Sequence, residues 1–408
     1  MSKYGKIRRT KSLYKKKKSG FRRVLETAVF VVVAFGIGFV GFTIAQTVIH
    51  YTPAVNSGGD GTEATASDNT LDNTDNTGDN TGDTPDSTGD TANPVPATGG
   101  LAVYPPSSVL SSILSSAEAL SEYAAVAESD GYEALVIELK DDEGRLLYAS
   151  AIEGIAGDEE VIAGGLTAAE IADAVRAAGL RPVARINTLK DHIAPLKRQD
   201  VAYRIAGSEW MWLDNVPGIG KRWANPFLQG TADYIGEVVE ELYAAGFAEV
   251  ILANAVFPPF KREDFGLLSP HITNTHTRFA ALGDFVNAVS GRVPEGDILL
   301  EIAVSDLSEG EVPVGTAEVL RNKEPSVSIS GVAAVFTVQD LGARNADTGE
   351  FEGIPAAVKA GLRLAVEHGG GLEVIPLLDL DAGADEAVRR EVIAAFEANG
   401  YEKYIIRG

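Results

Sequence analysis

The chain has 408 residues, a formal net charge of −23 and no cysteine. The charge is unevenly distributed, because residues 1–23 carry eleven Lys and Arg and no acid, which leaves −34 on the remainder. A chain this acidic would repel phosphate groups, so we expect no nucleic-acid partner. The absence of cysteine from the sequence excludes disulfides, thiolate metal sites and thiol nucleophiles.

The first hundred residues predict a membrane anchor followed by a spacer. The stretch 27–49 has no charged residue, and at about 1.5 Å per residue it is long enough to cross a hydrocarbon core of roughly 30 Å. We therefore expect a basic cytoplasmic tail over 1–24 and one transmembrane helix over 25–50. A cleaved signal peptide is the alternative, but the apolar run is long and no clear small-x-small site ends it. Residues 51–99 are mostly Asp, Asn, Thr and Gly, which predicts a disordered linker outside the cell membrane.

Residues 100–408 predict a closed (β/α)₈ barrel of the TIM type. Eight apolar runs have the continuous character of buried parallel strands, and they cover 101–104, 134–139, 181–187, 249–254, 297–304, 332–338, 372–378 and 403–407. Helical segments separate nearly all of them, over 108–128, 167–179, 231–246, 275–291, 315–323, 354–369 and 384–400. Eight such repeats favour a closed barrel. An open doubly wound sheet is the alternative, but its glycine-rich phosphate loop is absent after the first strand.

Polar residues gather where these strands end, which is where the active site of such a barrel forms. Aromatic faces with carboxylates and amides suit a sugar ligand, and paired carboxylates suit glycosidic cleavage. We therefore predict Asp142, Glu301 and Asp379 as catalytic residues. The predicted substrate-binding residues are Glu138, Lys140, Asp141, Arg185, Asn187, Lys190, Asp191, Trp212, Trp223, Asn225 and Asn254.

Structural roles remain the alternative for several of these residues. The segment 140–142 would form a solvated turn ending at Gly144. Glu301 would form an interior ion pair with Arg185 or Lys140. The tryptophans and Asn225 would pack and anchor the long loop after the third strand. The five histidines lack HExxH or similar spacing, so we expect neither a metal nor another cofactor.

Four segments carry a family resemblance: "ALVIELKDDEGRLLYAS", "LRPVARINTLKDHIAP", "WMWLDNVPGIGKRWANPF" and "AAGFAEVILANAVFPP". They resemble the "Putative glycosyl hydrolase domain" family of bacterial envelope proteins, which implies a barrel and a carbohydrate ligand. The family pattern "FDYxRFP" on the fourth strand is "LANAVFPP" here, with Ala253 and Val256 in place of the aspartate and arginine. The resemblance implies that this aspartate is the natural catalytic candidate. Its absence means that hydrolysis is lost or that Asp142, Glu301 or Asp379 carries it out.

Two functions therefore stay open. The first is a membrane-anchored extracytoplasmic glycoside hydrolase acting on a cell-envelope polysaccharide or oligosaccharide through paired carboxylates. The second is a catalytically degenerate barrel that binds a glycan or a protein partner in the envelope. A membrane scaffold without a ligand is a third interpretation that the sequence does not exclude.

Overall fold

The structure is a computed structural model that describes residues 101–214, 218–307, 319–320, 326–342, 352–380 and 386–407. The predicted basic tail, transmembrane helix and linker lie outside these residues. Among the residues described, no helix combines the length and the apolar character needed to cross a membrane.

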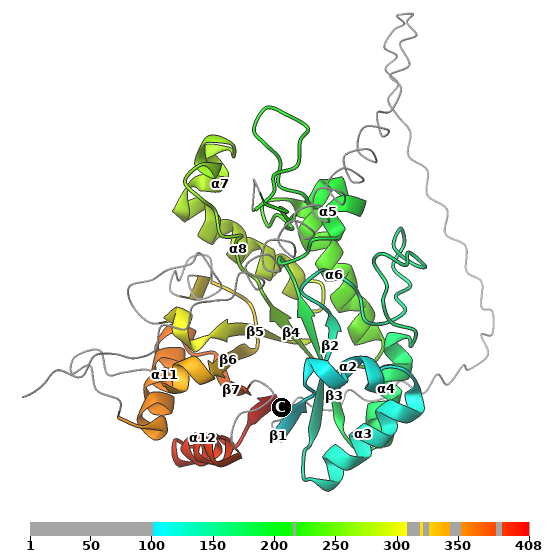
Figure 1. Cartoon of the computed structure of the whole chain (residues 1–408), viewed down its shortest axis with the longest axis vertical. Coiled ribbons are helices and arrows are strands. Elements are labelled where there is room, and N and C mark those ends of the chain that lie inside the picture. Colours follow the sequence, from blue (N-terminus) through cyan, green and yellow to red (C-terminus); the bar gives the residue numbers. More distant parts are fainter. Residues whose placement is uncertain are drawn as a thin grey trace, which may run out of the picture. The chain divides into compact units, whose positions relative to one another are not determined.

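Eight parallel strands close into a barrel, which confirms the predicted TIM barrel (Figure 1). Each strand pairs with the next one along the chain, and the last pairs with the first. The strands are β1 (Leu101–Tyr104), β2 (Ala134–Lys140), β3 (Arg181–Asn187), β4 (Glu249–Ala253), β5 (Asp297–Ala303), β6 (Gly331–Thr337), β7 (Glu373–Asp379) and β8 (Tyr404–Arg407).

Helices surround the barrel and cover the outward faces of its strands (Figure 1). The α-helices are α2 (Ser107–Ile113), α3 (Ala117–Ser129), α4 (Ala168–Ala177), α5 (Ala194–Lys197), α6 (Gln229–Ala244), α7 (Pro270–Thr273), α8 (Thr275–Ser290), α10 (Val338–Leu341), α11 (Ile354–Gly369) and α12 (Glu386–Ala398). Of the helix predicted over 315–323, only residues 319–320 are described, so most of that prediction lies outside the described chain.

The helix predicted over 108–128 is in fact two helices, so that prediction was wrong in its continuity. The side chain of Ser116 accepts a hydrogen bond from the Ala119 N–H at 3.2 Å and caps the start of α3. A serine at this position ends one helix and begins the next, because its side chain replaces a backbone hydrogen bond. Helix α2 is therefore a separate element, and it begins three residues after the C-terminal end of β1.

Side chains alternate between the barrel interior and the helices, and this alternation places the polar groups. A small interior cluster includes Val136, Val183, Leu299 and Leu377. Because strand side chains repeat every second residue, the residue two positions further along also faces the interior. A ring of mostly polar residues therefore surrounds the C-terminal mouth: Tyr104, Glu138, Arg185, Ala253, Glu301, Thr337, Asp379 and Arg407. Ala253 is the member from strand β4, and it is fully buried.

Candidate functional site

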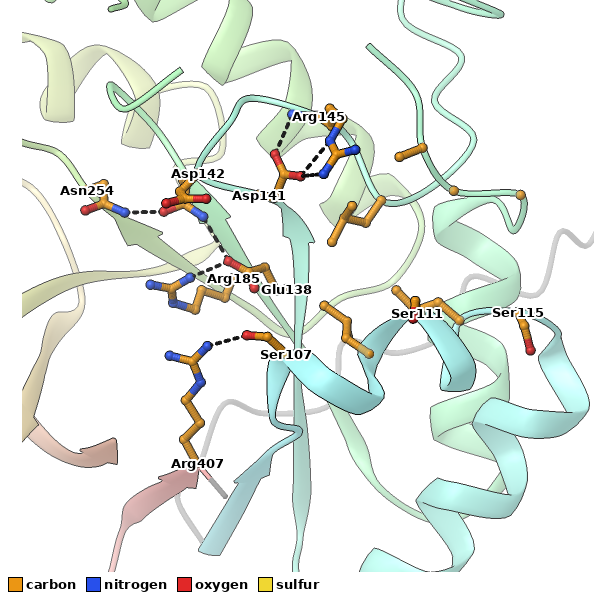
Figure 2. Close-up of a pocket in the computed structure, with 17 residues that line it drawn as sticks. Ser107, Ser111, Ser115, Glu138, Asp141, Asp142, Arg145, Arg185, Asn254 and Arg407 are labelled. Carbon is orange, nitrogen blue, oxygen red and sulfur yellow. Dashed lines mark hydrogen bonds and ion pairs between the residues drawn. The ribbon is translucent and has the colours of Figure 1, made fainter. Parts of the chain in front are cut away.

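A cleft opens at the C-terminal mouth of the barrel. Its volume is about 710 Å³, and small-molecule sites commonly have about 300–1,000 Å³. Helix α2 and the residues directly after it line one part, and segments 141–147 and 163–165 of the loop after β2 line another. The remaining lining comes from polar side chains at or just after the ends of β2, β3, β4 and β8 (Figure 2).

Arg185 of strand β3 joins two of the predicted acids. Its Nη1 donates to Glu138 Oε1 at 2.8 Å, while its Nε and Nη2 donate to the two carboxylate oxygens of Glu301 at 2.6 and 2.7 Å. Burial opposes the charged form of Arg185, but Glu301, Tyr104 and Glu138 outweigh it and raise the pKa of Arg185 well above its ordinary value. The ion pair between Glu301 and Arg185 that the sequence offered as an alternative is therefore present.

A chain of amides extends this network to strand β4. Asn254 Nδ2 donates to Asn187 Oδ1, and Asn187 Nδ2 donates to Glu138 Oε1 at 2.9 Å. Asn254 has a φ of 50°, and it is the one non-glycine residue of the described chain with a positive φ. Such a conformation costs free energy that the surrounding contacts must offset. The strained residue lines the cleft, and Asn187 fixes the position of its side-chain amide.

Arg407 of strand β8 holds the predicted acid Asp379 of β7. Its Nη1 donates to Asp379 Oδ2 at 2.8 Å. Its Nη2 donates to Ser107 Oγ at 2.7 Å (Figure 2). Tyr104 lies between the two arginines, with its ring centroid 4.6 Å from the guanidinium of Arg407 and 5.6 Å from that of Arg185. Burial raises the pKa of Tyr104 well above its ordinary value. The phenol is therefore a hydrogen-bond donor, and it points to Glu138 Oε2 at 3.3 Å.

Asp142 is the predicted catalytic residue that lines the cleft. Its Oδ2 lies 2.6 Å from Lys190 Nζ, and its side chain is 52% exposed. The hydrogen bond from Lys190 lowers the pKa of Asp142. Asp142 is therefore ionised near neutral pH and is not poised to donate a proton. Glu301 and Asp379 are not among the residues that line the cleft, and each is paired with an arginine that does line it.

Asp141 organises the turn that leaves strand β2. Its Oδ1 accepts hydrogen bonds from the N–H groups of Glu143, Gly144 and Arg145 at 2.8–3.1 Å, and its Oδ2 accepts one from Arg145 Nε at 2.9 Å. Gly144 has a φ of 103°, which disfavours any residue with a Cβ. The predicted turn ending at Gly144 is therefore present, and the Asp141 side chain stabilises it through these hydrogen bonds.

Lys140 and Asp191 form a buried pair beneath the cleft. Lys140 Nζ lies 2.7 Å from Asp191 Oδ2, and both side chains are fully buried. Asp191 Oδ1 also accepts from the N–H groups of Ile193 and Ala194 at 2.9 and 2.7 Å. A register shift after Glu138 precedes Lys140, and such bulges redirect the side chains that follow. The pair therefore ties strand β2 to the loop after β3.

The two tryptophans predicted to bind substrate, Trp212 and Trp223, are buried. The indole N–H of Trp212 donates to Asp264 Oδ1 at 2.8 Å, and that of Trp223 donates to Asp214 Oδ2 at 2.8 Å. Both rings are buried. Asn225 is also buried, and its side-chain oxygen accepts from the Phe227 N–H at 3.1 Å. These contacts connect the three residues to the long loop after β3 and to Asp264.

Of the predicted residues, those that line the cleft are Glu138, Asp141, Asp142, Arg185, Asn187 and Asn254. Sequence reasoning missed Ser107, Arg145 and Arg407, which line it too, and Tyr104, which supports it. Arg407 was recognisable, because it continues the interior-facing period of "YIIR" on the last strand. No cluster of three or more potential metal ligands is found within the described part of the chain.

The model of a family described as "Putative glycosyl hydrolase domain" matches residues 109–308. Of the described residues that line the cleft, this match covers all except Ser107 and Arg407, and it confirms the resemblance predicted from the sequence. No curated protein matches the chain.

Several solved structures are similar to this chain. The catalytic domain of a β-amylase from Paenibacillus polymyxa is 10% identical, with 75% of this chain and 91% of that chain covered and a TM-score of 0.46. The glycoside hydrolase domain of PelA from Pseudomonas aeruginosa is 13% identical, with 76% and 94% covered and a TM-score of 0.39. A hypothetical protein from Ruminiclostridium thermocellum ATCC 27405 is 18% identical, with 49% and 96% covered and a TM-score of 0.38. At these identities and TM-scores, the similarities assign no activity to this chain.

Proposed function

Because residues 109–308 belong to the "Putative glycosyl hydrolase domain" family, we propose that this protein binds a polysaccharide or oligosaccharide in the cleft and does not cleave it. The observation that carries the proposal is the composition of the cleft. Leu110, Leu114 and Leu147 offer apolar contacts, while serines and amides offer hydrogen bonds. Such a mixture suits a sugar, which has apolar C–H faces and a polar hydroxyl rim.

The state of the carboxyl groups argues against hydrolysis. Glycosidic cleavage needs one carboxyl that donates a proton and a second that acts as base or nucleophile. Both oxygens of Glu301 accept hydrogen bonds from Arg185, and Asp379 is paired with Arg407. Asp142 faces the cleft, but Lys190 lowers its pKa. Strand β4 contributes the methyl group of Ala253 where the family pattern has an aspartate.

Hydrolysis remains the second candidate, because Asp142 and Glu138 line the same cleft. In this alternative, Asp142 would serve as base or nucleophile, and Glu138 would need to donate a proton after leaving Arg185. Replacing Asp142 with Asn would then abolish the release of reducing ends without preventing glycan retention. Release of reducing ends by the wild type would itself contradict the binding-only proposal.

The proposal includes a position in the cell envelope. The apolar stretch within 25–50 would anchor the chain, and the linker 51–99 would hold the barrel on the outer side of the cell membrane. The features that support this are the basic tail and the uncharged stretch of the sequence. Protease added to intact cells would then remove the barrel, whereas a barrel on the cytoplasmic side would survive.

A steric block tests the cleft directly. A Cβ at Gly165 would meet no atom within 4 Å, and Gly165 lines the cleft. Gly165→Trp therefore adds a bulky ring at the cleft without a clash at its Cβ. Gly266→Trp is the matched control, because Gly266 also has no neighbour within 4 Å of its Cβ and does not line the cleft.

The assay uses the full-length chain in a detergent without a sugar headgroup, with a polysaccharide panel scored separately for retention and for reducing ends. We expect wild type and Gly266→Trp to retain one class of glycan without cleaving it, and Gly165→Trp to lose at least about tenfold in affinity, roughly 1.4 kcal/mol. Equal retention by all three proteins would refute the assignment of the cleft. Retention of no glycan would refute the function and direct attention to a protein partner.

A further inference from the structure

The charges at the cleft restrict the kind of glycan that fits it. Resting on the proposed function above, we infer that the ligand is an uncharged glycan, and that the cleft selects against sugars carrying carboxylate, phosphate or free amine groups. The inference concerns the class of sugar, which neither the family match nor the fold determines.

Each charged side chain among the described residues that line the cleft is already matched by an opposite charge. These residues include three carboxylates and three arginines, so the described part of the lining carries no net charge. The ion pairs are Glu138 with Arg185 at 2.8 Å, Asp141 with Arg145 at 2.8 Å, Asp142 with Lys190 at 2.6 Å, and Arg407 with Asp379 at 2.8 Å.

These pairs differ in how well they resist a competing charge on a ligand. Arg185 and Glu138 are only 10% and 12% exposed, and separating a buried pair leaves an uncompensated charge, which is strongly unfavourable. Arg407 is 22% exposed and is held by Ser107 as well as by its carboxylate. A uronate or phosphate would have to displace these partners to gain a charged hydrogen bond. Asp142 is the most exposed of the three described carboxylates in the lining, and it is already paired with Lys190, so a sugar amine would have to compete with this lysine.

The other described residues that line the cleft carry no charge. Helix α2 and the turn after it contribute Ser107, Ser111 and Ser115, which follow one another at intervals of four residues. Residues four apart lie on the same side of a helix, and Figure 2 shows the three serines along one edge of the site. Leu110 and Leu114 lie between them in sequence and also line the cleft. The serine hydroxyls and leucine side chains can contact a neutral sugar, and these contacts need no charged group on the protein or on the ligand.

The net negative charge of the barrel domain also disfavours the binding of anionic glycans. Residues 101–408 contain 24 Lys and Arg and 48 Asp and Glu, a net charge of −24. Such a field repels polyanions and attracts polycations at low salt, and both effects are screened as salt rises. An anionic glycan therefore meets repulsion before it reaches a cleft whose arginines are already occupied.

Matched oligosaccharides test the inference. One pair compares β-1,4-linked glucose oligomers with the same oligomers oxidised at C6 to uronates, and another compares N-acetylglucosamine oligomers with their de-N-acetylated, cationic forms. Binding is measured by calorimetry on the full-length chain, at about 50 mM and 500 mM salt so that the screening length changes several-fold. Gly165→Trp and Gly266→Trp report whether a given ligand occupies the cleft.

We expect a neutral oligomer to bind with an affinity that changes less than about twofold with salt and is lost in Gly165→Trp. Its charged counterpart should bind at least about tenfold more weakly, or bind in a salt-sensitive way that Gly165→Trp does not alter. A charged oligomer that binds as tightly as its neutral counterpart and is blocked by Gly165→Trp would overturn the inference while leaving the proposed function intact. If no oligomer binds in a manner that Gly165→Trp blocks, the proposed function fails instead.

A gain of binding provides the second test. Asp379→Asn removes the carboxylate partner of Arg407 and leaves the guanidinium facing the cleft, so uronate oligomers should gain about tenfold in affinity through a charge-assisted hydrogen bond. Glu373→Gln is the control, since Glu373 lies on the same strand and forms a 2.8 Å ion pair with Lys403 away from the cleft. Identical uronate affinity in both variants would show that ion pairing does not set the selectivity.

Discussion

Replacing Arg185 with methionine should be the most damaging single change at the barrel mouth. The side chain makes three charge-assisted hydrogen bonds of 2.6–2.8 Å to Glu138 and Glu301. All three side chains are 15% exposed or less, so solvent screens them weakly. Removing one partner of a buried ion pair costs about 3–5 kcal/mol, mostly because the remaining charge is left unpaired. We therefore expect Arg185→Met to lower the free energy of unfolding by about that amount at pH 7.

Urea unfolding followed by tryptophan fluorescence measures this loss. Arg292→Met is the matched control, because Arg292 forms the same two-bond contact with Glu240, at 2.9 and 2.7 Å, on the exposed face of the helices. That pair is 35% and 43% exposed, so its loss should cost less than about 1 kcal/mol. Equal losses of stability in the two variants would refute the reasoning.

Two further predictions concern the loop after β2. A Cβ at Gly164 would lie 2.0 Å from the backbone oxygen of Leu147, so Gly164→Ala should lower the free energy of unfolding by about 1–3 kcal/mol. A Cβ at Gly165 would meet no atom within 4 Å, so Gly165→Ala should leave the free energy of unfolding nearly unchanged. Equal thermal midpoints of the two variants would contradict this prediction. The hydrogen bond from Lys190 lowers the pKa of Asp142, so this carboxylate contributes stability above its unfolded pKa that is lost as the pH falls through its folded pKa. Lys190→Met should raise the carboxyl pKa in an NMR titration, and an unchanged titration would show that the bond is absent in solution. Because both groups are more than a third exposed, the change in stability should stay below about 1 kcal/mol.

The barrel was predictable from the sequence because buried parallel strands have a distinctive composition. The runs "ALVIEL" and "VAAVFTV" are apolar at every or nearly every position, since one face meets the barrel interior and the other meets the helices. The break in the helix predicted over 108–128 was not predictable from hydrophobic spacing, because it depends on the side chain of one serine, Ser116. Ser116 is also compatible with a helix interior until its capping contact is known.

The positions of the strand ends in the sequence predicted many of the cleft residues. They did not predict which carboxylates are paired with an arginine. Alternation along β5 places Glu301 inside the barrel, and the candidates for its partner were limited to Arg185 and Lys140. The partner of Asp379 was not foreseen, because Arg407 follows it by 28 residues and is adjacent only once β7 and β8 pair in register. The contribution of α2 was hidden for the same reason, because its leucines and serines read as part of one continuous helix.

The ring at the barrel mouth explains why binding is favoured over hydrolysis in physical terms. Acid–base catalysis by two carboxyls depends on environments that push their pKa values apart, so that one is protonated while the other is charged. Here Arg185 binds Glu138 and Glu301 together, and so gives both carboxylates the same cationic neighbour. Ala253 stands where a third carboxylate would otherwise compete for Arg185. A mouth organised in this way keeps its charges fixed and paired, which suits a rigid recognition surface better than a proton-transfer site.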